Sequence, residues 1–334
     1  MAELPTDDPR TCRQLVGHDA AWAQFLSVIR TGRLHHAWLL TGPEGVGKAT
    51  MAFMMARALL GAMDHDSPVG RRVAAGTHAD LLVIARSVNE KSRKKTKKGA
   101  SPPLRREIVA DDVRPIGTFL HRTAAEGGWR VVIVDGADYM NRTAANAILK
   151  ILEEPPERAI LILTAAMPGR LLPTIRSRCR VLSLSALDGA AMRTVLASLP
   201  DAPPTEQLEA ILALAHGAPG RAVELLRAGG VELAGLVANV MAGGVDQERA
   251  YDLAAGVLAQ ENGFCVFFDL LCDAISDRAC DLARNTATPH AGDLRPARMA
   301  LLWQDMVRLR AETEQFNLDK QQALLTALAR VSEI

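Results

Sequence analysis

A glycine-rich loop that ends in a lysine is the part of this sequence best suited to chemistry. It reads GPEGVGK over residues 42–48, follows a short apolar run and opens a stretch of helical composition. Glycines let backbone N–H groups approach phosphate oxygens, the amino end of a helix adds partial positive charge, and a lysine ammonium reaches the outer phosphates. We therefore expect Gly42, Gly45, Gly47 and Lys48 to bind the phosphates of a nucleotide such as ATP or ADP.

The residues after this lysine argue against a well-held magnesium ion. Loops of this type continue with Ser or Thr, whose hydroxyl ligates Mg²⁺, but Ala49 offers only a methyl group. Thr50 comes next, and one residue along an α-helix is a rotation of about 100°, which turns its hydroxyl away from the phosphates. Ala49 and Thr50 belong to the predicted nucleotide site, which we expect to hold Mg²⁺ weakly if at all.

A second apolar run, Val131–Val134, ends in a carboxylate. Asp135 follows it, at the carboxyl end of a predicted strand, where it is suited to hold Mg²⁺ through water. An efficient ATPase would continue with a glutamate that polarises the attacking water, and Gly136 stands there instead. Asp138 has a shorter reach and is better suited to hydrogen bonding at the start of a helix. With Ala49, two hydrolytic groups are missing, which predicts nucleotide binding without efficient hydrolysis.

Shortly after Pro173, three arginines fall within five residues, at Arg176, Arg178 and Arg180. One hypothesis is a surface that forms ordinary ion pairs. The other is that a guanidinium stabilises the spread charge of a phosphoryl-transfer transition state on a neighbouring protein's nucleotide. The spacing alone does not separate the two.

Short apolar runs alternate with helical stretches over the first ~185 residues, which is typical of a parallel sheet covered by helices. The runs are Ala37–Leu40, Leu81–Ala85, Val131–Val134, Ile160–Thr164 and Val181–Leu184. The helical candidates between them are Lys48–Leu60, Asp111–Ala125 and Thr143–Leu152. Beyond Leu184 the strand-like runs stop, so the fold class is α/β followed by an all-helical part.

Composition narrows the class of protein further. The 334 residues carry a formal charge of +1, and 49% are hydrophobic, which excludes a disordered or polyanion-coating chain. The longest nearly uncharged apolar run, Ala159–Met167, is far shorter than the ~20 residues that span a bilayer. The first ten residues show no secretory pattern, so we expect a cytoplasmic protein without membrane contact. The cysteines are scattered, with no CxxC pair, which favours packing over metal ligation.

One segment differs in composition from the rest. Six Lys or Arg residues fall within Lys91–Lys98, and such a run must be solvated. It is either a surface loop or a finger that contacts nucleic-acid phosphates, in which case Lys94, Lys95, Lys97 and Lys98 are the candidates. No aromatic residue is interleaved, so base stacking is not indicated.

Several blocks of the sequence together carry a resemblance to a known family. They are RLHHAWLLTGPEGVGKAT (33–50), HADLLVI (78–84), VVIVDGADYMNRTAANAILKILEEPP (131–156), ILTAAMPGRLLPTIRSRC (162–179) and GAPGRA (217–222). In these blocks the chain resembles the clamp-loader branch of the AAA+ proteins, which serve bacterial DNA polymerase III. The match covers nearly all of the first 225 residues, and ANAILKILEEPP and SRC are its most specific parts. A weaker match, NLDKQQALLTAL, lies at 317–328.

The resemblance implies roles for particular residues. Arg178 would be an arginine finger that reaches ATP on an adjacent subunit, and Thr164 and Arg221 would be nucleotide sensors. It also implies a RecA-like parallel-sheet P-loop domain over residues 1–185, a helical lid over 186–230 and an all-α collar over 231–334. The partners would be tau/gamma and delta subunits in a hetero-pentamer, which acts on a sliding clamp and primed DNA during DNA replication.

Departures from the family set the expected activity. Many members carry four cysteines that hold zinc before the HADL-like block, but residues 61–77 contain none, so we expect no zinc. The leading hypothesis is an accessory subunit of the polymerase complex without polymerase chemistry and without effective ATPase activity of its own. The alternatives are an active AAA+ clamp-loader ATPase of the tau/gamma kind and a DNA-binding accessory module built on the basic segment.

Overall fold

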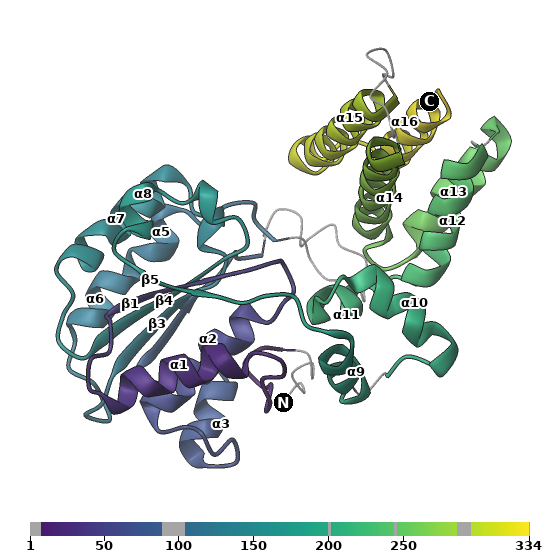
Figure 1. Ribbon diagram of the computed structural model, residues 1–334. Coiled ribbons are helices and arrows are strands. Elements are labelled where there is room, and N and C mark those ends of the chain that lie inside the picture. Colours follow the sequence, from purple (N-terminus) through teal and green to yellow (C-terminus); the bar gives the residue numbers. More distant parts are fainter. Residues whose placement is uncertain (1–7, 89–103, 200–201, 244–245, 286–294, 334) are drawn as a thin grey trace. The chain divides into compact units, whose positions relative to one another are not determined.

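The apolar runs of the first half form a parallel sheet in the computed structural model, which describes residues 8–88, 104–199, 202–243, 246–285 and 295–333. Within these residues the strands are β1 (Ala37–Thr41), β2 (Leu81–Ile84), β3 (Arg130–Val134), β4 (Ala159–Ala165) and β5 (Arg180–Ser183). Their order across the sheet is β2-β3-β4-β1-β5, and neighbouring strands are parallel (Figure 1). The predicted parallel sheet is confirmed.

Helices cover both faces of this sheet, which is why its strands are continuously apolar. In chain order the helical elements of this part are α1 (Asp19–Arg30), α2 (Lys48–Leu60), α3 (Pro68–Ala74), α5 (Ala110–Val113), α6 (Pro115–His121), η1 (Ala137–Tyr139), α7 (Arg142–Glu153), η2 (Pro168–Arg170), α8 (Pro173–Arg176) and α9 (Gly189–Ala197). Figure 1 shows α1 and α2 on one face and α6 and α7 on the other. On the first face, Trp38 of β1 meets Phe25 of α1 edge to face, with ring centroids 5.4 Å apart.

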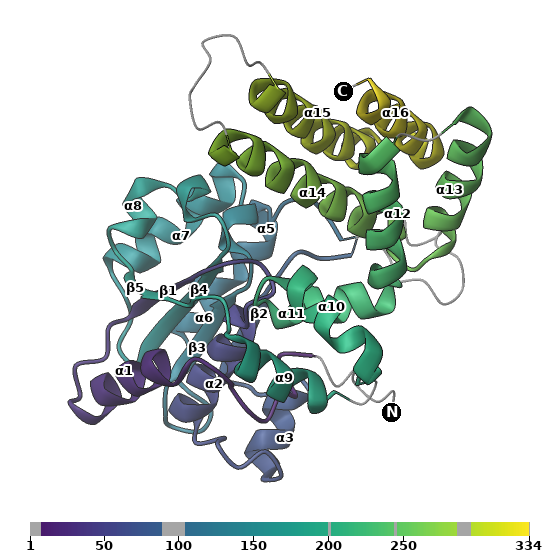
Figure 2. The same ribbon diagram turned by 45° about the vertical axis from the view of Figure 1, so that its right-hand side comes forward.

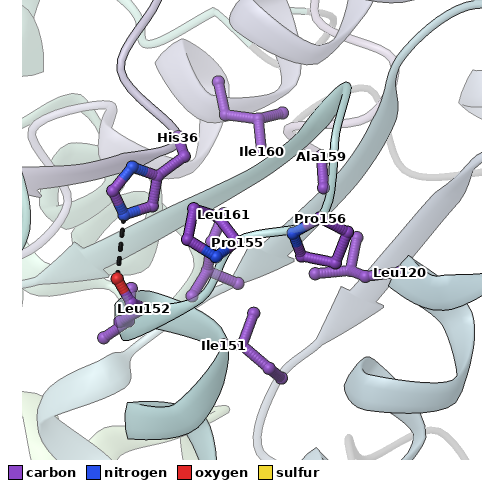
Figure 3. Close-up of a pocket in the computed structure, with 9 residues that line it drawn as sticks. All are labelled: His36, Leu120, Ile151, Leu152, Pro155, Pro156, Ala159, Ile160 and Leu161. Atoms are coloured by element: carbon purple, nitrogen blue, oxygen red, sulfur yellow. Dashed lines mark hydrogen bonds between the residues drawn. The ribbon is translucent and has the colours of Figure 1, made fainter.

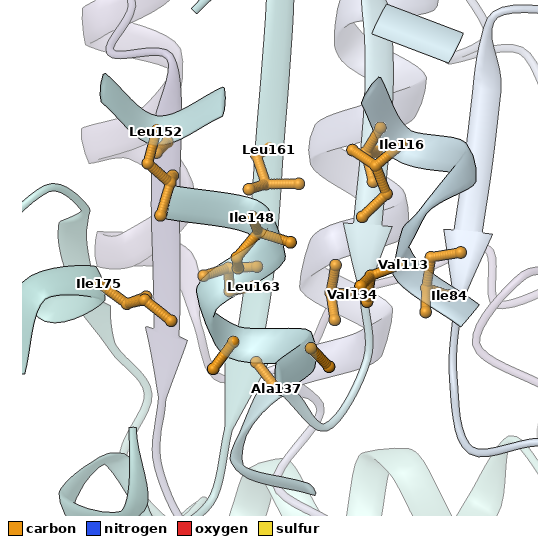
Figure 4. Packing of buried hydrophobic residues seen from close by; sticks show 14 of the residues in the cluster. Ile84, Val113, Ile116, Val134, Ala137, Ile148, Leu152, Leu161, Leu163 and Ile175 are labelled. Carbon is orange, nitrogen blue, oxygen red and sulfur yellow. The ribbon is translucent and has the colours of Figure 1, made fainter. Parts of the chain in front are cut away.

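The core under α7 shows how the sequence positions this helix. The Asn141 side chain accepts a hydrogen bond from the Ala144 backbone N–H at 2.9 Å and so caps the amino end. Ile148 and Leu152 lie four residues apart on one face and are buried. They belong to the same apolar cluster as Leu163 of β4, as Figure 4 shows. The observed helix extends the predicted one by a single residue at each end.

One predicted helix, Asp111–Ala125, is wrong as a single element. The structure contains α5 and α6 instead, with Pro115 at the first position of the second. Pro115 has no backbone N–H to donate to the preceding turn, so the hydrogen-bond ladder breaks there. After His121 the chain becomes extended at Arg122, four residues short of the expected end.

The described residues separate into two compact units. One contains those within Met1–Ala202 together with His216–Arg221, and the other contains those within Pro203–Ala215 and Ala222–Ile334. The first unit therefore includes the sheet and also the short segment that leads into α11 (Pro219–Arg227). The three-domain division expected from the sequence stays a prediction.

The second unit is helical, as expected from its composition. In chain order its elements are α10 (Thr205–Ala215), most of α11, α12 (Gly230–Gly243), α13 (Gln247–Ala259), α14 (Gly263–Asn285), α15 (Arg295–Phe316) and α16 (Lys320–Ser332). Helix α14 packs along α15 (Figure 2), and its Phe267 and Phe268 are fully buried. Their rings meet edge to face with centroids 6.4 Å apart.

No helix among the described residues is by itself long and apolar enough to cross a bilayer. The bent pairs Pro219–Arg227 with Gly230–Gly243 and Arg249–Ala259 with Gly263–Arg284 reach the required length and composition only in combination.

Candidate functional site

The loop of residues 42–48, which we call the glycine loop, joins the carboxyl end of β1 to the first turn of α2. Gly42 has φ +147°, and a Cβ there would lie 2.2 Å from the Leu184 carbonyl oxygen. Gly47, directly before α2, has φ +106°. Both positions therefore require glycine, the first for space and both for backbone conformation. The buried His18 ring lies against the loop, with Nε2 2.8 Å from the Val46 carbonyl oxygen.

The Lys48 side chain turns back into the glycine loop. Its ammonium donates hydrogen bonds to the carbonyl oxygens of Gly42 at 2.9 Å and Pro43 at 2.6 Å. Only 9% of the residue is exposed, and this burial lowers the pKa of the ammonium against the opposing effect of nearby carboxylates, Glu44 first. A cation is thus held inside the loop, where an anionic group would be attracted.

The start of α11 contacts the glycine loop within the first unit. The Gly220 backbone N–H donates a hydrogen bond to the Gly45 carbonyl oxygen at 2.8 Å. A Cβ on Gly45 would lie 2.8 Å from the Arg221 backbone nitrogen, and one on Gly220 would lie 2.8 Å from the Gly45 Cα. The two glycines allow this close backbone approach. Arg221 is therefore brought next to the loop, although it is far away in sequence.

Asp135 and Thr164 meet at the carboxyl ends of β3 and β4. The Thr164 hydroxyl donates a hydrogen bond to Asp135 Oδ1 at 2.7 Å and accepts one from the Gly136 backbone N–H at 2.8 Å. Thr164 is 1% exposed. Its single hydroxyl proton is therefore already used on the carboxylate, and we call these three residues the Asp135 network.

Asp138 lies in η1 and acts as a hydrogen-bond acceptor. Its Oδ2 accepts from the backbone N–H groups of Ala166 at 3.0 Å and Met167 at 2.8 Å, directly after β4. The residue is 7% exposed, and its Oδ1 is buried without a partner among the described residues. The carboxylate fixes the turn that follows β4.

The arginines after Pro173 differ in their surroundings. Arg178 forms an ion pair with Glu153 of α7, with Nη2 and Oε1 2.9 Å apart, and its Nη1 donates to the Thr174 carbonyl oxygen at 3.1 Å. The Arg180 guanidinium lies over the Trp38 ring at 5.1 Å from the centroid. Arg176 is exposed, and its side chain has no ion pair within the described part of the chain. The ion pair between Arg178 and Glu153 was not predicted from the sequence, because no local pattern links two residues so far apart in the chain.

Cys179, which follows Arg178, is a packing residue. It packs against the cluster under α7, and burial raises the pKa of its thiol to about 12. Such a thiol stays protonated at neutral pH and is inert as a nucleophile.

The remaining predicted residues are placed as follows. Ala49 and Thr50 lie in the first turn of α2, and both are half-buried. Lys94, Lys95, Lys97 and Lys98 lie outside the described residues. The structure brings the glycine loop and Arg221 together, and it joins Asp135 to Thr164. It gives Arg178 separate partners on α7 and α8.

A small pocket lies at the amino ends of β1 and β4 rather than at the carboxyl ends that carry the predicted nucleotide residues. Figure 3 shows its largely apolar lining, which includes Pro155 and Leu161. His36, its titratable side chain, places Nε2 3.0 Å from the Leu152 carbonyl oxygen. Burial lowers the pKa of this histidine. The pocket therefore has the character of a gap in packing at the end of α7.

The sheet order, the glycine loop after β1 and the largely helical second unit define the chain as a protein of the AAA+ class. The fold is similar to that of a DNA polymerase III gamma subunit-related protein from Thermotoga maritima. The likeness has a TM-score of 0.50 and 19% identity, and it covers 93% of this chain and 99% of that one. The α/β fold predicted from the sequence is confirmed.

Sequence relatives then identify the family. The family described as "DNA polymerase III, delta subunit" matches residues 17–188. DNA polymerase III subunit delta' of Pseudomonas aeruginosa is 37% identical over 75% of this chain and 74% of its own length, and that of Escherichia coli is 30% identical over 70% and 67%. The chain belongs to the delta' family of DNA polymerase III subunits, in the clamp-loader branch of the AAA+ proteins.

The same branch includes longer proteins. DNA polymerase III subunit gamma/tau of Mycobacterium tuberculosis is 28% identical over 82% of this chain, but the match spans only 44% of that protein. Clamp-loader subunits of both kinds are therefore relatives of this chain, and the delta' relatives match it over more of their length.

Proposed function

We propose that this chain is a non-hydrolysing subunit of a clamp loader that donates Arg178 to the ATP site of a neighbouring subunit. In this proposal it assembles with tau/gamma and delta subunits into a hetero-pentamer, which loads a sliding clamp onto primed DNA. Family membership supports the clamp-loader setting. The division of labour is supported by the contacts of the chain's own residues.

The glycine loop fits a nucleotide phosphate. Gly42, Gly45 and Gly47 all have a positive φ that favours glycine, a Cβ at Gly42 or Gly45 would also clash with the backbone, and the Lys48 ammonium lies inside the loop. A bound ATP or ADP would be held by these groups, with Arg221 next to them. The bound nucleotide would supply the phosphates that Arg221 is proposed to sense.

The fit to magnesium is poor. Ala49 has no ligand atom where a hydroxyl is needed. Asp135 is the remaining candidate ligand; the hydrogen bond from Thr164 occupies one acceptor site of its carboxylate, so the missing hydroxyl at Ala49 is what weakens the metal site. The proposed site therefore binds nucleotide with Mg²⁺ held weakly, and we propose that the chain carries no zinc, because residues 61–77 contain no cysteine.

The Asp135 network is the observation that carries the proposal. A hydrolytic site needs a carboxylate that polarises water and a sensor that reaches the outer phosphate. Here Gly136 contributes only a backbone N–H, and the buried Thr164 hydroxyl is engaged with that N–H and with Asp135. The residues that would drive hydrolysis are thus either absent or used to hold the sheet ends together.

The first test is ATP turnover by the isolated, full-length chain. We expect no turnover above background, while nucleotide binding is measurable and is lost in Lys48→Ala, because the ammonium inside the loop is removed. The same chain should support turnover when it is combined with gamma/tau and delta subunits, clamp and primed DNA. Turnover by the isolated chain that Lys48→Ala abolishes would instead make it an active ATPase.

A glutamate introduced at the missing position should not restore hydrolysis. Gly136 has φ +76°, and a Cβ there would lie 2.8 Å from Tyr139 Cδ2. Gly136→Glu should therefore destabilise the fold by about 1–3 kcal/mol, the usual cost of such backbone strain. Chemical denaturation checks the stability, with Gly128→Glu as the control, because a Cβ at Gly128 meets nothing within 4 Å. A stable Gly136→Glu variant that hydrolyses ATP would contradict our account of this position.

A further inference from the structure

The ion pair between Glu153 and Arg178 joins parts of the chain that are separate in sequence. Glu153 is the last residue of α7, and Arg178 follows α8. The two helices lie side by side in both views (Figures 1 and 2) and are in contact. The pair links the ANAILKILEEPP block to the SRC block, the most specific parts of the sequence resemblance.

The position of Glu153 is not explained by the stability of its own helix. The carboxyl end of a helix carries partial negative charge, so an acidic residue in the last turn is unfavourable there. Glu154 follows directly, and then Pro155 and Pro156, which prevent the helix from continuing. A carboxylate at this rigid end acts more favourably on a cation outside the helix, and Arg178 is that cation.

The contacts of Arg178 fix the direction of its guanidinium. Nη2 lies 2.9 Å from Glu153 Oε1 in an ion pair, and Nη1 donates a hydrogen bond to the Thr174 carbonyl oxygen at 3.1 Å. A guanidinium has five N–H donors, and these contacts engage at most two of them. The Arg178 side chain is 36% exposed, so part of it is open to a group outside this chain.

We propose that Glu153 is a positioning residue that holds the Arg178 guanidinium ready for the phosphate oxygens of a neighbouring subunit's nucleotide. This inference rests on the proposed function, because it requires Arg178 to act in trans. A free arginine side chain samples many rotamers, and only a fraction of them point the planar fork at a given phosphate. When contacts at both terminal nitrogens hold the guanidinium, most of the conformational entropy that binding would cost has been lost before the neighbouring subunit binds.

The expected size of the effect follows from the exposure of the pair. Exposed ion pairs are weak, and their usual strength corresponds to a factor of about two to five in an equilibrium. Glu153→Ala should thus lower the turnover number of the assembly about two- to fivefold. The KM for ATP should stay unchanged, because a finger of this kind acts mainly in the transition state.

Glu153→Gln distinguishes positioning from charge. An amide oxygen at this position can accept a hydrogen bond from the nearby guanidinium, so this variant should keep most of the wild-type rate. Glu154→Ala is the matched control, because it removes the same charge one residue later and Glu154 has no ion pair among the described residues. We expect it to leave the turnover unchanged.

The experiment uses the reconstituted assembly of gamma/tau, delta and this chain, with clamp and primed DNA, and measures ATP turnover over a range of ATP concentrations. Glu153→Ala is measured alone and in the Arg178→Ala background, where it should cause no further loss.

A rate for Glu153→Ala equal to or above wild type overturns the inference, as does an equal loss in Glu154→Ala or a further loss in the Arg178→Ala background. If Arg178→Ala keeps full turnover, the proposed function fails and this inference fails with it. If Arg178→Ala lowers turnover and Glu153→Ala does not, only the proposed role of Glu153 is overturned.

Discussion

Arg178→Ala is expected to reduce ATP turnover at the neighbouring site of the assembled clamp loader by about 10³-fold. An arginine supplied in trans stabilises charge that develops on the transferred phosphoryl group, and losses of this order follow its removal. Arg178 is partly exposed, and its contacts with Glu153 and Thr174 leave donors for an outside acceptor. Steady-state turnover of the reconstituted assembly, stimulated by clamp and primed DNA, is the measurement.

The neighbouring arginine provides the control for Arg178→Ala. Arg176 is exposed and has no ion pair within the described residues. Its replacement by alanine removes the same charge as Arg178→Ala does. Arg176→Ala should therefore keep turnover close to wild type. Both variants should bind the other subunits normally in gel filtration, because neither side chain belongs to the buried core. Full turnover in an intact Arg178→Ala assembly would exclude the finger role.

Arg57→Met should destabilise the first unit by about 3 kcal/mol, because several buried backbone acceptors would lose a charged donor. Arg57 lies in α2 and is only 1% exposed. Its Nη1 donates to the carbonyl oxygens of Ala62 at 3.3 Å and Gly70 at 3.4 Å, and its Nη2 donates to that of Arg10 at 2.7 Å. Burial lowers the pKa of this guanidinium, and the carbonyl groups compensate for part of its lost hydration.

Thermal unfolding measures this effect. For a unit of about 200 residues, 3 kcal/mol corresponds to a decrease in Tm of about 6–12 °C. Arg33→Met is the control, because Arg33 is exposed and has no ion pair within the described residues, so its replacement should leave Tm nearly unchanged. Equal melting of the Arg57→Met variant and wild type would show that Arg57 does not hold the segment between α2 and β2. This segment includes residues 61–77, where the family resemblance implies zinc-binding cysteines in many members and this chain has none.

The strands and the glycine loop were predictable because their signals are local. A strand covered on both faces needs consecutive apolar residues, and β3 and β4 each lie within one residue of the predicted run. The glycine loop was recognised from the spacing of three glycines and a lysine together with the apolar run before it and the helical stretch after it. The break between α5 and α6 was missed although Pro115 marks it, because the apolar pattern continues through the proline.

The partners of the candidate residues were decided only by tertiary structure. Thr164 reaches Asp135 across 29 positions because β3 and β4 are neighbours in the sheet. The contact between Gly220 and the glycine loop, and the pairing of Glu153 with Arg178, likewise depend on which elements pack together.

The sequence by itself determined which groups are present: a lysine in a glycine loop, no magnesium-ligating hydroxyl after it, no glutamate after Asp135, and arginines after Pro173. The tertiary structure decided which of these groups are already engaged and which still have donors to offer. The physical reason is that residue type depends on the chain alone. Hydrogen-bond saturation and exposure depend on neighbours that only the folded sheet and helices bring together.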